Sequence, residues 1–90
     1  MHTVEKLDDS TFEVVVQGRS QTRHLVTVSS TYAEKLAGHL PVETLVSRSF
    51  DFLLERESNT SILSRFELSV IAHYFPEYER VIVEMLKQQI

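Results

Sequence analysis

The chain has 90 residues, enough for one small domain, and its 42% hydrophobic and 24% charged residues are typical of globular rather than disordered proteins. Thirteen acidic and nine basic residues give a formal net charge of −4, which disfavours nucleic acid and anionic membranes as partners. The absence of cysteine excludes disulfides, thiolate catalysis and cysteine-ligated zinc, and no apolar run approaches the roughly 20 residues that span a bilayer.

Two segments near the N-terminus are rich in β-branched residues and predict a β-hairpin. They read TFEVVVQ at 11–17 and TRHLVTVS at 22–29, and Gly18 in the intervening GRSQ suits a turn. One face of the two strands carries Phe12, Val14 and Val16, and His24, Val26 and Val28. Val4–Leu7, ahead of the turn signal DDS, can add a third strand, so we expect a hairpin or a three-strand meander.

After residue 30 the apolar residues recur every three or four positions, which is the period of an α-helix. Thr31 and Glu34 have the form of a capping box at a helix start, and Gly38 suits a C-terminal cap. These signals predict a short helix over Tyr32–Ala37.

The stretch SFDFLLERE belongs to the predicted central helix, which has Pro41 in its first turn and runs to about Glu57. Its apolar stripe consists of Val42, Leu45, Val46, Phe50, Leu53 and Leu54. Ser49 lies in the middle of this stripe, where a small residue lets another element approach closely. Phe52 lies beside the stripe, where it either widens the buried face, which we favour, or contacts a partner as an exposed aromatic.

The C-terminal third predicts two short helices and a longer last one. The first short helix, capped by Thr60 or Ser61, carries Ile62, Leu63 and Phe66. After a break at 67–69, with Ser69 as a cap, the second carries Leu68, Ile71, Ala72 and Phe75. Pro76 begins the last helix, with a stripe of Tyr78, Val81, Ile82, Met85 and Leu86. Strands followed by four to five helices make residues 1–90 a single α+β domain.

Basic residues are the remaining candidates for partner binding. Arg19, Arg23 and His24 fall close together at the hairpin tip, where they could hold a phosphate or an acidic side chain, although such a tip is more often a solvated turn. Arg56 closes the central helix as an anion-binding candidate or, as we favour, as part of a solvated helix end in which Arg56 and Glu57 extend over the edge of the core. A partly buried ion pair of Arg56 with Glu55 or Glu57 is a further alternative.

Catalytic and metal motifs do not emerge from the sequence. His73 and Glu77 have the spacing of two ligands on one helical face, but Pro76 lies between them and no third ligand follows. There is no G-x-S-x-G motif and no glycine-rich phosphate loop, so we expect no catalytic residue, metal or cofactor. The two short helices of 62–75 would permit a helix-turn-helix, but SVIAHYF has no lysine, arginine, asparagine or glutamine to read bases.

SFDFLLERESNTSIL together with IAHYFPEYE resembles a family of small, functionally uncharacterised bacterial proteins with the pattern SFxFLLERE, SIL and YFPEYE. The resemblance spans roughly Thr22 to Glu79. It implies a bacterial and cytoplasmic protein, and it brings no activity, cofactor or catalytic residue with it. The N-terminus MHTVEKLDDS, which has no basic and apolar signal-peptide pattern, agrees with a cytoplasmic location.

The sequence therefore favours a non-enzymatic protein-interaction or regulatory module with an unidentified protein partner. The alternatives are a helix-turn-helix-like nucleic-acid-binding protein and a small enzyme with an unrecognised site. A hairpin exposes two edges, which the strand Val4–Leu7, a partner's strand or the same strand of a second copy could cover, so a homodimer is one of the alternatives. The copies would meet through the strand Thr11–Gln17 or through the stripe of the last helix.

Overall fold

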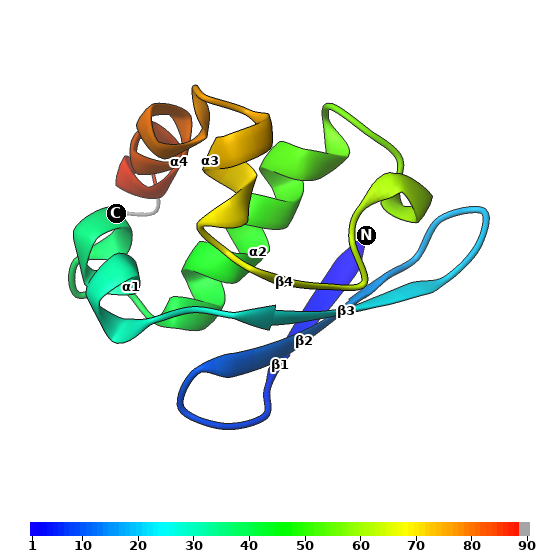
Figure 1. The fold of residues 1–90 in the computed structure, drawn as a ribbon, viewed down its shortest axis with the longest axis horizontal. Helices are drawn as coiled ribbons and strands as arrows, with labels where there is room; N and C mark the ends of the chain where they lie inside the picture. Colours follow the sequence, from blue (N-terminus) through cyan, green and yellow to red (C-terminus); the bar gives the residue numbers. More distant parts are fainter. Residues whose placement is uncertain (89–90) are drawn as a thin grey trace.

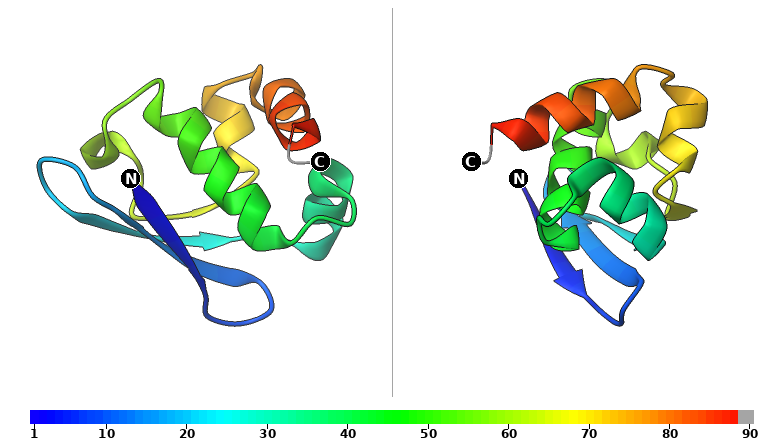
Figure 2. Two further views of the ribbon diagram at one scale, coloured as in Figure 1. Left: turned by 180° about the vertical axis from the view of Figure 1, so that it is seen from behind. Right: turned by 90° about the vertical axis from the view of Figure 1, so that its left-hand side faces the viewer.

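The computed structural model describes residues 1–88, which form a four-stranded sheet with four α-helices on one of its faces (Figures 1 and 2). The elements in chain order are β1 (His2–Lys6), β2 (Thr11–Val16), β3 (Thr22–Thr27), α1 (Ser30–Ala37), α2 (Val42–Leu54), the short 3₁₀ turn η1 (Asn59–Ser61), β4 (Arg65–Glu67), α3 (Val70–Tyr74) and α4 (Tyr78–Lys87). The predicted α+β class is confirmed, with strands first. None of the helices in this part of the chain is long and apolar enough to cross a membrane.

The sheet has the order β1-β2-β3-β4. The first three strands form an antiparallel meander, in which Val14 lies opposite both Val4 and His24, whereas β4 runs parallel to β3. The third N-terminal strand is therefore present, although it begins at His2. Because β1 and β3 flank β2 on both sides, the expectation that Thr11–Gln17 offers an open edge to a second copy is wrong.

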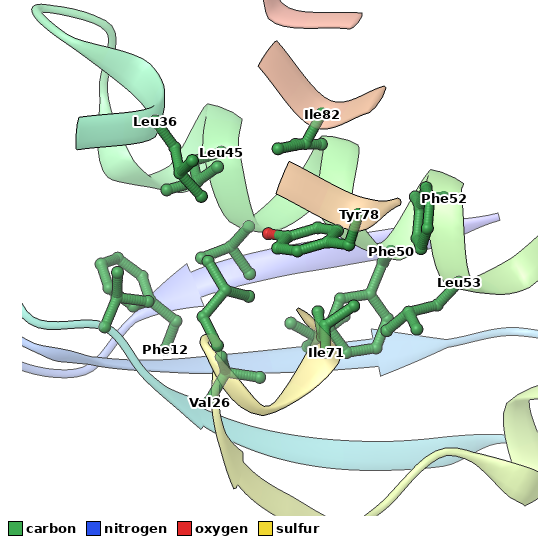
Figure 3. Packing of buried hydrophobic residues seen from close by; sticks show 14 of the residues in the cluster. Phe12, Val26, Leu36, Leu45, Phe50, Phe52, Leu53, Ile71, Tyr78 and Ile82 are labelled. Carbon is green, nitrogen blue, oxygen red and sulfur yellow. The ribbon is translucent and has the colours of Figure 1, made fainter. Parts of the chain in front are cut away.

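The core lies between the inner face of the sheet and the helices (Figure 3). The predicted inward residues of β2 and β3 are all buried, since alternate side chains of a strand point to the same face. In the stripe of α2, the residues Leu45, Val46, Phe50 and Leu53 are buried, whereas Val42 and Leu54 at its two ends are half-buried. Phe52 is buried too, as favoured from the sequence. In α4, Tyr78, Ile82 and Leu86 pack into the same core, which leaves them unavailable to a second copy.

Helix ends differ from the prediction in detail. Ser29, not Thr31, caps α1, because its Oγ accepts a hydrogen bond from the Tyr32 N–H at 3.1 Å. Gly38 ends this helix with a φ of 59°, as predicted. The central helix α2 stops at Leu54 rather than near Glu57.

The C-terminal third contains the main error of the prediction. The expected helix carrying Ile62, Leu63 and Phe66 does not form, because this segment makes η1 and then pairs with β3 as β4. Phe66 reaches the core from a strand, with Arg65 and Glu67 on the opposite face. A helix-turn-helix over 62–75 is thereby excluded, since only α3 is helical there.

Candidate functional site

An apolar groove of about 340 Å³ lies between the end of α2, the segment Ser61–Phe66 and α3. Its apolar lining includes Leu53, Ile62, Leu63, Phe66, Ile71 and Tyr74. Glu57 is the one charged side chain in this lining, so the groove suits an apolar occupant and offers no cation to a phosphate.

Two side chains at the groove are much more exposed than large apolar residues usually are. Tyr74 is 68% exposed and Leu63 is 48% exposed. Among the described residues, the other exposed large hydrophobic side chains are Met1 and Leu7, which do not line the groove. Exposed apolar side chains beside an apolar groove are typical of surfaces that bind a protein, a membrane or an apolar ligand.

A partly buried hydrogen-bond network fixes one wall of the groove. The Nδ1–H of His24 donates to the carbonyl of Leu63 at 2.8 Å, which leaves Nε2 to accept from the Thr22 hydroxyl at 2.9 Å. Asn59 Nδ2 donates to the same hydroxyl oxygen at 2.9 Å and to the Ser20 carbonyl at 2.8 Å. The network ties η1 and Leu63 to β3 and its turn, so the groove wall is held in place.

Arg56 fixes the helices behind the groove. Its guanidinium lies 3.6 Å from the centre of the Phe52 ring, and Nη1 donates to the Phe52 carbonyl at 3.0 Å. The same side chain pairs with Glu77 at 3.3 Å and with Glu55 at 3.5 Å. A hydrogen bond from its own backbone N–H, together with Arg56, holds the pKa of Glu77 below its usual value. Arg56 therefore joins the end of α2 to the start of α4.

The free edge of β4 borders the groove. The Leu25 N–H donates to the Ser64 carbonyl and the Leu68 N–H to the Thr27 carbonyl, at 2.8 and 2.9 Å. In a parallel pair these bonds alternate along the strand, so the backbone groups of Arg65 and Glu67 point away from β3. They form an open edge on the side of the molecule that faces the viewer in Figure 1.

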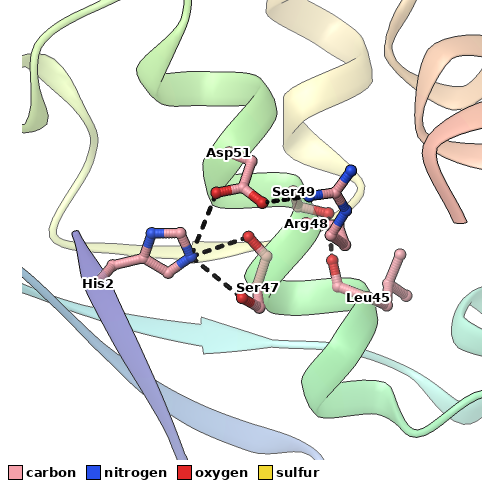
Figure 4. Close-up of polar contacts among 6 residues, drawn as sticks. All are labelled: His2, Leu45, Ser47, Arg48, Ser49 and Asp51. Carbon is pink, nitrogen blue, oxygen red and sulfur yellow. Dashed lines mark hydrogen bonds and ion pairs between the residues drawn. The ribbon is translucent and has the colours of Figure 1, made fainter. Parts of the chain in front are cut away.

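A second cluster combines histidine, serine and aspartate between β1 and α2 (Figure 4). His2 Nε2 lies 3.0 Å from the Ser47 carbonyl, 3.1 Å from the Ser47 Oγ and 3.8 Å from Asp51 Oδ1, and Arg48 pairs with Asp51 at 2.8 Å. Because a carbonyl oxygen only accepts, the contact with the Ser47 carbonyl favours the tautomer that has its hydrogen on Nε2, and in that tautomer Nε2 cannot take a proton from the serine. A serine nucleophile needs the opposite arrangement. The contacts with Ser47 hold His2 of β1 against α2.

The candidate residues at the hairpin tip are not brought together. Arg19 is exposed in the turn, and Arg23 points to the outer face of β3, where it pairs with Glu13 at 3.4 Å. His24 points to the inner face and is only 2% exposed, because neighbouring residues of a strand face opposite sides. The prediction of a basic surface that includes His24 is therefore wrong. Phe52 and Arg56, by contrast, are in direct contact, with Phe52 fully buried.

Sequence reasoning missed Leu63 and Tyr74 as exposed groove residues and Arg65 and Glu67 as an edge. The alternation of charged and apolar residues in RFEL was the available signal, since it is the pattern of a half-buried strand. Within residues 1–88, no group of three histidine or acidic side chains is placed to hold a metal ion. No protein-family model, curated protein or solved structure matches the chain. The resemblance to a bacterial family stays a prediction.

Proposed function

We propose that this chain is a non-enzymatic protein-interaction module whose docking surface is the apolar groove. The observation that carries the proposal is the pair of exposed side chains, Leu63 and Tyr74, beside a groove whose wall is held by partly buried hydrogen bonds. A surface that is already ordered loses little conformational freedom on binding, which favours its use as a recognition site.

Two observations support this function over the alternatives. In the His2 cluster, the Ser47 carbonyl favours the tautomer with the hydrogen on Nε2, which cannot activate the serine, and this argues against an enzyme of that kind. The groove contains one carboxylate and no basic side chain, and the chain carries a net charge of −4, which argue against nucleic acid.

Site-specific photocrosslinking tests the proposal. Benzoylphenylalanine in place of Tyr74 should crosslink to one specific protein when the chain is expressed at its native level. That protein can be a different protein or a second copy of this chain. The matched control carries the same group in place of Leu7, which is 51% exposed but does not line the groove. Adding Leu63→Asp to the Tyr74 probe should remove the crosslink.

Each result decides the matter. A product at position 74 that is absent at position 7 and sensitive to Leu63→Asp supports a docking groove. The same products at both positions, or none at position 74, would overturn it. For the nucleic-acid alternative, tight binding to random duplex that falls steeply with salt would be the decisive result.

A further inference from the structure

The edge strand β4 is complementary to itself. Its outward backbone groups belong to Arg65 and Glu67, which have opposite charges and lie on either side of Phe66. Resting on the proposed function, we propose that the groove's partner is a second copy of this chain. The two copies pair antiparallel through β4 about a two-fold axis at Phe66.

The register follows from the phase of the strand. In an antiparallel pair, residues that point their N–H and C=O groups at each other exchange two hydrogen bonds. With Phe66 opposite Phe66 of the second copy, Arg65 lies opposite Glu67 of the second copy, and the reverse holds by symmetry. Both pairs exchange hydrogen bonds, and both place opposite charges side by side on the outer face.

Other registers in which Arg65 and Glu67 still point toward the second copy do not pair opposite charges. Moving the axis by one residue sets Arg65 opposite Arg65 of the second copy, or Glu67 opposite Glu67. Like charges directly opposite each other are unfavourable in a sheet. Only the register centred on Phe66 joins opposite charges at both positions, so the charges select it.

The groove adds apolar contact to the same interface. Figure 2 shows the helices of one copy on one face of its sheet. A two-fold axis perpendicular to the sheet keeps the helices of both copies on the same face. The grooves, which open beside β4, then face each other across the axis, and Leu63 and Tyr74 lie where the two copies meet. The result is a continuous eight-stranded sheet in place of two four-stranded ones with an open edge.

The opposite edge does not offer the same match. In β1, Thr3 and Glu5 face β2, as the bonds from the Leu7 and Gln17 N–H groups show, so His2, Val4 and Lys6 face outward. Antiparallel self-pairing about Val4 would set His2 opposite Lys6, with no carboxylate in either pair. The groove lies at the other side of the sheet, so β4 is the edge that carries the proposal.

Charge exchange at β4 tests the register. Sedimentation equilibrium over micromolar to millimolar concentrations should show reversible dimers for the wild type. Arg65→Glu and Glu67→Arg should each raise the dissociation constant about tenfold or more, because each change acts twice across the axis. The double variant, with the two charges exchanged, should recover dimerisation, and an equimolar mixture of the single variants should form heterodimers.

The control is Arg19→Glu, which changes the net charge like Arg65→Glu but lies in the β2–β3 turn. It should leave the dissociation constant unchanged. A wild type that stays monomeric at millimolar concentration overturns the dimer. If position 74 still crosslinks to another protein, the groove keeps its proposed function. The proposed interface is overturned if the single charge exchanges leave the dissociation constant of the dimer unchanged. It is also overturned if the double variant does not recover dimerisation. Circular dichroism on every variant separates loss of pairing from loss of fold.

Discussion

A buried hydrogen bond joins α2 to α4 at the point where the sequence places a small residue in the apolar stripe. Ser49 Oγ donates to the Leu45 carbonyl at 2.7 Å and lies 2.7 Å from the Tyr78 hydroxyl. Because the serine hydrogen is already used, the phenol is the donor of the second bond. Both side chains are fully buried, and this burial raises the pKa of Tyr78, so the phenol stays protonated.

The two truncations should differ in cost. Ser49→Ala leaves the buried phenol without an acceptor, which should lower the free energy of unfolding by about 1–3 kcal/mol. Tyr78→Phe leaves Ser49 bonded to Leu45 and should cost about 1 kcal/mol. The double variant should be less destabilised than the sum of the two, by a coupling energy of about 1 kcal/mol.

Urea unfolding followed by far-ultraviolet circular dichroism measures these differences, at one protein concentration for all variants. Tyr74→Phe is the matched control, because this tyrosine is exposed and its hydroxyl should contribute less than about 0.5 kcal/mol. Additive single costs, or a larger cost for Tyr78→Phe than for Ser49→Ala, would refute the assigned direction of the bond.

Three further predictions concern stability. Leu53→Ala should cost about 2–5 kcal/mol in urea unfolding, since Leu53 is 3% exposed, and a loss below about 1 kcal/mol would contradict its place in the core. Gly38→Ala should lower the free energy of unfolding by about 1 kcal/mol, measured by thermal unfolding. The cost comes from the φ of 59° alone, because an added Cβ meets nothing within 4 Å. An unchanged midpoint of unfolding would count against that backbone conformation. The Tyr32 hydroxyl, 2.7 Å from Glu79, holds the pKa of that carboxyl below its usual 4.5, so the stability it contributes is lost as the pH falls below that value. Tyr32→Phe should therefore flatten the decline of stability in acid, and an identical acid profile would disprove the link.

Periodicity made much of the helical layer predictable. The stripe of α2 from Leu45 to Leu53 identifies its buried face, and the stripe of α4 does the same for Ile82 and Leu86. Alternation made the inner face of β2 and β3 predictable too, including His24. The same alternation shows why His24 was wrongly grouped with Arg19 and Arg23 as a basic surface. These residues are close in sequence, but His24 points to the inner face of the sheet.

Much of the candidate site was not predictable in this way. The groove needs α2, η1 and α3 to meet, and no local pattern specifies how far apart they pack. Arg56 bonds to Glu77, which lies 21 positions away in the sequence, and His24 bonds to the Leu63 carbonyl, which lies 39 positions away. Such pairs depend on the packing of whole elements, so the sequence predicted an ion pair for Arg56 with its neighbours but not with Glu77.

The sequence alone determined the α+β class, the β2–β3 hairpin and the amphipathic helices α2 and α4, because these follow from patterns of side-chain polarity over a few residues. It left open whether a third strand precedes the hairpin. Only the tertiary structure decided that Arg65–Glu67 is a strand. The alternation in RFEL is compatible with a strand, but three residues are too few to decide between a strand and a helix, and an isolated strand of this length has no partner for its backbone groups. The edge of β3 supplies those hydrogen bonds. Residues 65–67 can reach this edge because α1 and α2, which lie between the two strands in the chain, return the chain to β3.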